Sequence, residues 1–309
     1  MTTHNPIAIG FCAGTRIVSL RGEVAIERLA QGDQVLTLSG TGAPLKRVAA
    51  IARVTVSLAA HPAPETVQPI RIGADAFEPG VPIRDLRVAP GHGIAAEDGH
   101  GRRVLVPARL LVNGATIRRE PAEGEITYLR LDVDGHDIVM ADGMGAAGDG
   151  DTQANPMPAI AARTLHATLL ERAQACGHAL VDDPGLAVLH VGQETSPIAA
   201  EPGEYLFLLP PGCAAVTLRS RLFVPADTDP AGGDLRQLGI ALHGIIHDGA
   251  EIDLAGPACG TGFLPPEGEP GRQWRWTTGD AVIDLPPRPD ETTLELRYHH
   301  GWGRYWSRG

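Results

Sequence analysis

The chain contains little cysteine, and its cysteines are isolated from one another. Cys12, Cys176, Cys213 and Cys259 are widely spaced in 309 residues, and none belongs to a C-x-x-C pair. This pattern excludes a disulfide framework and a zinc finger. No apolar run approaches the roughly 18 residues of a membrane span, and the N-terminus lacks the basic start and apolar core of a signal peptide. We therefore expect no membrane span, and the compartment stays open between the cytoplasm and a signal-independent export route.

Positive charge is also scarce. The 26 Lys and Arg residues are outnumbered by 37 Asp and Glu residues, which gives a net charge of −11. Neutralising nucleic-acid phosphates needs clustered basic side chains, and the largest basic clusters here are pairs such as Arg102-Arg103. Dinucleotide-binding, Walker-type and Ser-His-Asp signatures are absent from the sequence. We therefore expect no nucleic-acid partner and no cofactor.

Short strands dominate the first half of the chain. Segments such as TRIVSL, QVLTLS and RVLVPARLL are rich in Val, Ile and Leu and are bounded by turn-forming residues. Residues 126–133 alternate clearly between two faces of a strand. One face carries Ile126, Tyr128, Arg130 and Asp132, and the other carries Thr127, Leu129, Leu131 and Val133. The sequence predicts a mainly β fold.

A change in composition divides the chain. Residues 143–158, GMGAAGDGDTQANPMP, are small, polar and turn-forming. The next stretch, AIAARTLHATLLERAQAC, has apolar residues at helical spacing and ends before Gly177, a stop signal. Strands then return at the spacing of a sandwich. We predict a first domain over 1–155, a linker with an amphipathic helix over 156–185, and a β-sandwich-like domain over 186–309.

Three segments of the first half resemble the Hint (Hedgehog/intein) domain family. They are GTRIVSLRGEVAIERLAQGDQVLT, then LRVAPGHGI with VLVPARLLVNGATI, and finally ITYLRLDVDGHDIVMADGM. In order and spacing they match the opening hairpin, the histidine block and the late block of that family. The resemblance covers roughly residues 8–155. It implies a Hint-type β fold and a bacterial Hint-type protein with an additional C-terminal β domain.

The resemblance implies self-directed acyl chemistry. A Hint nucleophile attacks the carbonyl of the preceding residue, and a thiol suits this step because it is a strong nucleophile. A nearby histidine protonates the departing amide nitrogen. His92 matches the histidine-block position, and His136 and Asp137 match the late block, where they would polarise the scissile region or relay a proton. With Cys12 as nucleophile, the implied function is a single-turnover N-to-S acyl shift and self-cleavage, with the N-terminal segment as substrate.

The sequence departs from the family at the nucleophile. In the family this residue lies five positions before the Thr of GTRI, where this chain has Gly10, and Cys12 lies only three positions before Thr15. No His-Asn pair follows MADGM, so splicing by asparagine cyclisation has no residue to perform it. Two hypotheses stay open. One is an autoprocessing domain that uses the displaced Cys12, and the other is a catalytically inert Hint scaffold with a ligand-binding C-terminal domain. In both we expect Gly10, His92 and His136 to meet at one site.

The C-terminal part contains two further candidate sites. His243 and His247 in HGIIH have a spacing that suits zinc on a helix, but the surrounding sequence alternates like a β-hairpin, so we expect no metal site. All four tryptophans lie in the last third, at Trp274, Trp276, Trp302 and Trp306. Such rings form either a sandwich core or a stacking platform for sugars. A glycan or another protein is therefore a candidate partner of this domain.

Overall fold

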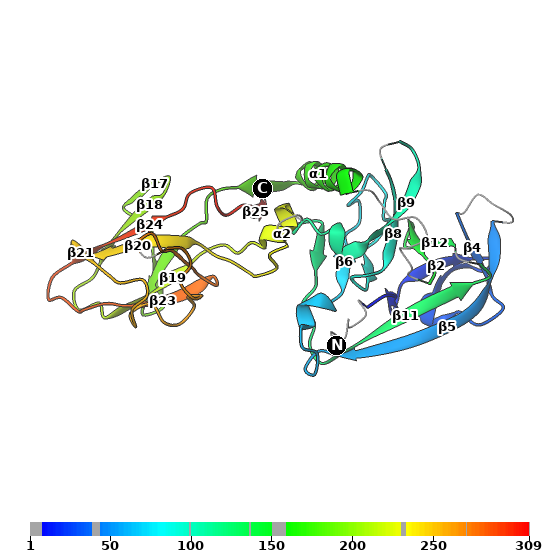
Figure 1. Ribbon diagram of the computed structural model, residues 1–309, viewed down its shortest axis with the longest axis horizontal. Coiled ribbons are helices and arrows are strands. Elements are labelled where there is room, and N and C mark those ends of the chain that lie inside the picture. The colour runs from blue at the N-terminus through cyan, green and yellow to red at the C-terminus, as the bar shows by residue number, and fades with distance from the viewer. Residues whose placement is uncertain are drawn as a thin grey trace. The chain divides into compact units, whose positions relative to one another are not determined.

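The computed structural model describes residues 8–38, 44–98, 100–135, 137–149, 159–229, 233–269 and 271–308. The chain divides into two compact units, Met1–His178 and Ala179–Gly309 (Figure 1). Strands make up most of the regular structure of both units, so the predicted mainly β fold is confirmed. Among the described residues, no helix is long and apolar enough to cross a membrane. The domain limits at 155 and 186 stay a prediction.

The described part of the first unit is built on one antiparallel sheet of thirteen strands. The strand order is β10-β6-β7-β1-β11-β5-β4-β2-β12-β13-β8-β9, and β3 pairs with β2. The strands are β1 (Phe11–Cys12), β2 (Arg16–Ser19), β3 (Gly22–Ala25), β4 (Gln34–Leu36), β5 (Leu45–Ser57), β6 (Ile70–Ile72), β7 (Leu86–Val88), β8 (Gly93–Glu97), β9 (Arg103–Pro107), β10 (Ile117–Arg119), β11 (Glu125–Val133), β12 (Ile138–Ala141) and β13 (Met144–Ala147).

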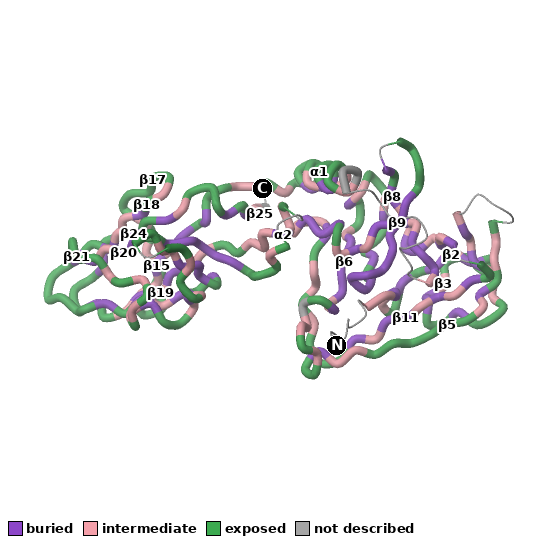
Figure 2. Tube along the Cα trace, viewed as in Figure 1, coloured by how far each residue is buried: buried purple, intermediate pink, exposed green. Residues whose placement is uncertain are grey.

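Strand β11 contributes to two hydrophobic clusters, as its alternation predicts. Ile126 and Tyr128 belong to a small cluster, whereas Leu129, Leu131 and Val133 belong to the main core. Its partner β5 is mostly exposed or half-buried along its length (Figure 2). Both faces of β11 are therefore covered. Strand β1 pairs with β11, so its successive residues can pack in one cluster or the other.

Helical segments are short in the described part of the first unit, except for one helix. The 3₁₀ turns among its described residues are η1 (Ile26–Arg28), η2 (Pro64–Thr66) and η3 (Ala108–Leu110). The predicted helix is α1 (Ala159–Ala175). Its Leu169 is buried in the main core, and its His166 Nε2 lies 3.1 Å from the carbonyl oxygen of Val112. The helix therefore packs on the sheet of the first unit.

The described residues of the second unit form a sandwich of two sheets and a further pair of strands. Inner-face residues of both sheets share one core, which includes Val188 and Ile283 from one sheet and Phe207 and Leu296 from the other. The elements are β14 (His178–Val181), β15 (Ala187–His190), β16 (Gln193–Thr195), β17 (Ala199–Glu201), β18 (Glu204–Leu209), β19 (Ala215–Arg219), α2 (Pro225–Thr228), β20 (Ala241–His247), β21 (Ala250–Glu251), β22 (Arg275–Trp276), β23 (Asp280–Asp284), β24 (Thr292–Tyr298) and β25 (Tyr305–Arg308). The sandwich-like C-terminal fold agrees with the prediction.

Candidate functional site

The chain around Gly10 is held in place by backbone hydrogen bonds. The Gly10 carbonyl accepts a hydrogen bond from the Ala89 N–H at 2.9 Å, and the Ala8 carbonyl accepts one from the Gly91 N–H at 2.9 Å. Phe11 then pairs with Leu129 of β11 on one side and with β7 on the other. The peptide bond between Ile9 and Gly10 is therefore fixed by backbone contacts before and after it.

The imidazole of His92 lies against the amide of Gly10. The Gly10 N–H donates a hydrogen bond to His92 Nδ1 at 3.2 Å, so the expected approach of these two residues is confirmed. The ring is fully buried and meets the Phe11 ring edge-to-face at 4.2 Å. Because Nδ1 accepts, the neutral ring carries its proton on Nε2. This Nε2 has no hydrogen-bond partner among the described residues.

Burial determines the charge state of His92. Removal from water disfavours the imidazolium and lowers the pKa of His92 to about 3, although the negative charge of Asp149 acts in the opposite direction. The ring is therefore neutral at physiological pH. Its Nδ1 atom accepts the hydrogen bond from the Gly10 N–H and so holds this amide in place.

Residue 10 has no side chain and little room for one. Its φ of 132° is a conformation that L-residues with a side chain rarely adopt. A Cβ atom at this position would lie 3.0 Å from the Leu129 carbonyl oxygen and 3.0 Å from the Tyr128 Cβ. The junction thus combines a positioned amide with a residue that carries no nucleophile.

Cys12 projects to the other face of β1 from Phe11. Neighbouring residues of a strand point in opposite directions. Phe11 therefore packs in the main core, whereas Cys12 packs with Tyr128 and Ile126 in the small cluster. Burial raises the pKa of the Cys12 thiol to about 12, outweighing the opposite influence of Arg87. Since the thiolate is the reactive form of cysteine, Cys12 is held in its unreactive state.

The late block contributes a buried ion pair. The Lys46 Nζ lies 2.7 Å from Asp137 Oδ2, and the Asp137 side chain is completely buried. Its other oxygen accepts a hydrogen bond from the Ile138 N–H at 2.7 Å. Both carboxylate oxygens of Asp137 are thus engaged within the fold. His136, the other late-block candidate, lies outside the described residues.

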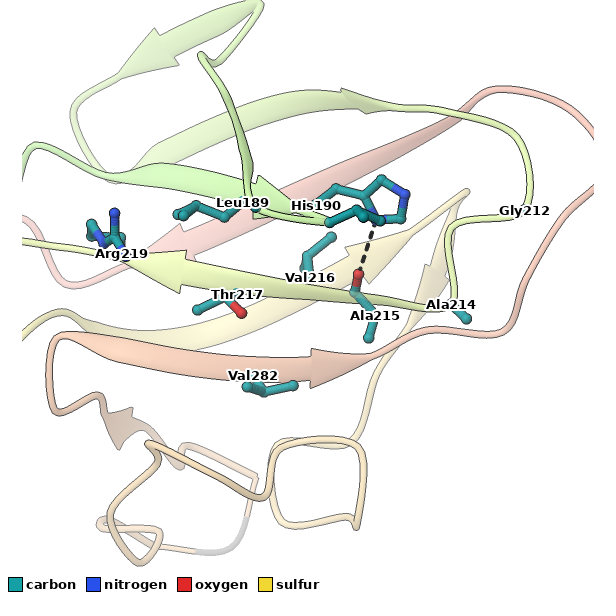
Figure 3. Close-up of a pocket in the computed structure, with 11 residues that line it drawn as sticks. Leu189, His190, Gly212, Ala214, Ala215, Val216, Thr217, Arg219 and Val282 are labelled. Atoms are coloured by element: carbon teal, nitrogen blue, oxygen red, sulfur yellow. Dashed lines mark hydrogen bonds between the residues drawn. The ribbon is translucent and has the colours of Figure 1, made fainter.

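The structure also brings together a cysteine and a histidine that sequence reasoning missed. Cys213 Sγ lies 3.3 Å from His190 Nδ1, and both groups also approach the Ala215 carbonyl oxygen, at 3.5 and 3.3 Å. His190 borders an open cavity of about 570 Å³ on the outer face of β15, β19 and β23 (Figure 3). The Cys213 thiol is 2% exposed, and burial raises its pKa. The raised pKa keeps the Cys213 thiol protonated, so it is not activated as a nucleophile. No sequence motif indicates that these two residues, which are 23 positions apart, would meet.

The HGIIH segment forms strand β20, as its alternation predicts. His243 is exposed, whereas His247 is buried and lies 3.0 Å from the Thr292 hydroxyl. Within the described ranges, no group of three or more His, Cys, Asp or Glu side chains is arranged to hold a metal ion.

These features define a β domain in which a buried histidine, His92, binds the amide of the Ile9–Gly10 peptide bond next to strand β1. Residues 9–147 match the model of the Hint domain family, so this part of the chain is a Hint domain, and it is followed by an additional β domain.

Several solved structures are similar to this chain. A bacterial intein-like domain from Clostridium thermocellum shares 16% identity at a TM-score of 0.31, over 46% of this chain and 99% of that one. The Msm DnaB1 intein splicing domain bound with zinc shares 16% identity at a TM-score of 0.31, over 44% and 98% of the two chains. The gp41-1 intein shares 11% identity at a TM-score of 0.28, over 45% and 98%. No curated protein matches the chain.

Proposed function

We propose that the first unit is a non-cleaving Hint domain, which holds its N-terminal junction in place as a scaffold and does not process it. The observation that carries this proposal is the hydrogen bond from the Gly10 N–H to His92 Nδ1, at a residue without a side chain. The amide is positioned as for autoprocessing, but nothing on residue 10 can attack the Ile9 carbonyl.

The protonation state of His92 supports the same conclusion. Release of an amide nitrogen requires a proton donor beside it. The Nδ1 atom that faces Gly10 accepts a hydrogen bond, and burial lowers the pKa of this histidine to about 3. To become a donor, the ring would have to bind a proton at an atom that already faces an N–H group. At neutral pH His92 therefore stabilises the intact peptide bond.

Cleavage through Cys12 is the competing function, and the geometry supports it less well. The Cys12 thiol would attack the Phe11 carbonyl and displace its own amide nitrogen. His92 is bonded to the amide of Gly10, two residues earlier. The thiol itself has a pKa raised by burial to about 12, so it is protonated at neutral pH.

Intact-mass spectrometry of the full chain distinguishes these functions. Cleavage before Gly10 removes residues 1–9, whereas cleavage before Cys12 removes residues 1–11. We expect neither loss during prolonged incubation at pH 7 to 8 with dithiothreitol or hydroxylamine. Cys12→Ala and, as a matched control, Cys176→Ala should behave like the unmodified chain. Loss of residues 1–11 that Cys12→Ala abolishes and Cys176→Ala does not would overturn the proposal in favour of self-cleavage.

A further inference from the structure

We propose that the second unit binds a neutral saccharide in a groove bordered by His243, His299, Glu251 and Arg272. The groove has a volume of about 660 Å³, which falls within the range of small-molecule sites. The groove is lined by His243 of β20, by residues 251–254 at and after β21, by residues 271–273, and by the residue that follows β24. This site lies entirely within the second unit, so its function does not depend on whether the Hint domain cleaves.

A bulge in β20 presents His243 to solvent. Leu242 pairs with Tyr298 and Gly244 pairs with Arg297, so the strand has one extra residue between these two pairs. Bulges of this kind turn a side chain away from the regular alternation. His243 is consequently exposed in the middle of a strand whose neighbouring residues are buried.

Stacked aromatic rings give the groove a flat, rigid surface. The His299 ring stacks on the Trp302 ring at 3.8 Å with an angle of 10° between their planes, and it lies 4.7 Å from the His243 ring. Burial, together with the neighbouring His243, lowers the pKa of His299. A neutral ring held in this way can pack against the C–H face of a sugar.

Two of the tryptophans, Trp274 and Trp302, contact the His299 ring. Trp302 is 45% exposed and Trp276 is buried, and Trp274 meets the His299 ring edge-on at 5.8 Å. Residues 274, 276, 302 and 306 are absent from the described lining of the groove. A stacking platform made by the tryptophans themselves stays a prediction. The histidines form the platform, and Trp302 supports it.

The polar side chains of the groove suit hydroxyl groups. Glu251, Arg272 and Gln273 are polar residues among those that line the groove. The Glu251 carboxylate accepts hydrogen bonds, the Arg272 guanidinium donates them, and the Gln273 amide does both. A sugar hydroxyl both donates and accepts, so it can form a hydrogen bond with any of these groups. A phosphate or uronate would be repelled by Glu251 and Asp253, whose combined charge exceeds that of Arg272.

A buried arginine makes one side of the groove rigid. Arg275 donates hydrogen bonds to the carbonyl oxygens of Leu254, Cys259 and Leu264, each at 2.7 Å, and lies 5.1 Å from the centre of the Phe263 ring. These bonds fix the loop that carries Leu254, which borders the groove. The site is therefore formed before a ligand arrives, which reduces the entropic cost of binding.

Titration of the full chain with defined sugars tests this proposal. The neutral probes are methyl glucoside, mannose, maltose and N-acetylglucosamine, and the charged probes are glucuronic acid and glucosamine. Saturation-transfer NMR and calorimetry at pH 7.5 should detect at least one neutral sugar at millimolar concentration, with weaker binding of glucuronic acid. Tryptophan emission should change on binding because Trp302 supports the platform.

Matched variants locate the site. Glu251→Ala and His243→Ala should each weaken binding by about tenfold, the effect of losing one hydrogen bond to a charged group or one stacking contact. His300→Ala removes an exposed histidine of the adjoining loop that does not line the groove, and it should bind like the unmodified chain. The proposal is overturned if no probe binds at tens of millimolar, if glucuronic acid binds more tightly than the neutral sugars, or if all three variants bind equally well.

Discussion

The two units use histidine in opposite ways. In the Hint domain, His92 is fully buried, neutral, and bonded to the backbone amide of Gly10. In the second unit, His243 is exposed on a bulge, and His299 lies between it and Trp302 at the border of an open groove. The comparison teaches that a buried polar group holds the fold together, because its loss leaves a partner unsatisfied in a dry interior. Exposed polar groups cost little to rearrange and remain available to ligands.

The largest loss of stability should follow from breaking the buried ion pair of the Hint domain. In Lys46→Met, the Asp137 carboxylate loses its cation while it remains buried, and removing one partner of such a pair costs about 3 kcal/mol or more. All four tryptophans lie in the second unit, so tryptophan fluorescence does not report on unfolding of the Hint domain. The loss of stability should therefore be measured by hydrogen exchange of peptides within residues 86–133.

The double variant Lys46→Met with Asp137→Asn is the control for this experiment. It also removes the negative charge of residue 137 and should recover a large part of the lost free energy of unfolding. Equal protection in the single variant and the unmodified chain would show that Asp137 is not held by this ion pair.

Acidification should weaken the Hint domain through His92. The pKa of this residue is about 3 in the fold and about 6.5 in an unfolded chain. Since the unfolded chain binds the proton first, this stability is complete above pH 6.5 and is lost as the pH falls toward 3. Between pH 7 and 4 the loss is on the order of 3 kcal/mol.

A His92→Gln variant isolates this contribution. Glutamine can still accept a hydrogen bond from the Gly10 N–H but does not titrate. The free energy of unfolding of the variant, measured by hydrogen exchange at several pH values, should therefore fall less steeply than that of the unmodified chain. Parallel pH profiles for the two proteins would show that His92 is not held neutral by burial.

Gly10→Ala should have a smaller effect on the same site. Its φ of 132° strains any residue with a Cβ, and that atom would meet the Leu129 carbonyl oxygen at 3.0 Å. We expect a destabilisation of about 1–3 kcal/mol, seen as faster hydrogen exchange at residues 8–12. Gly14→Ala is the control, because its φ is also positive but no atom lies within 4 Å of its added Cβ. An equal effect at both positions would mean that the crowding at Gly10 contributes nothing.

The smallest effect should come from an exposed ion pair of the second unit. Arg219 Nε lies 3.0 Å from Asp280 Oδ1, and both side chains are more than half exposed. Such pairs contribute about 0.5 kcal/mol or less on average. Arg219→Ala should therefore shift the tryptophan-monitored unfolding midpoint only slightly. A loss comparable to that of Lys46→Met would contradict the contrast between buried and exposed groups.

Much of the architecture could be predicted from local patterns. The alternation of residues 126–133 predicted the two faces of β11, because a strand allows only two side-chain directions. The stop at Gly177 predicted the end of α1 within two residues. The spacing from Thr15 placed the family's nucleophile position at Gly10, and the motif order placed His92 beside it. The catalytic roles suggested for Cys12, His92, His136 and Asp137 remain predictions.

Other features could not be derived from the sequence because they depend on contacts between distant segments. The bulge that exposes His243 results from how β20 pairs with β24, and the short contact between Cys213 and His190 joins two segments without a shared motif. The sequence by itself determined the strands, the helix and the glycine at position 10, since these follow from local geometry and residue identity. Only the tertiary structure decided that His92 is buried as an acceptor, that Cys12 faces the small cluster, and that two histidines border a groove. Burial and hydrogen-bond direction arise from packing, which no single segment specifies.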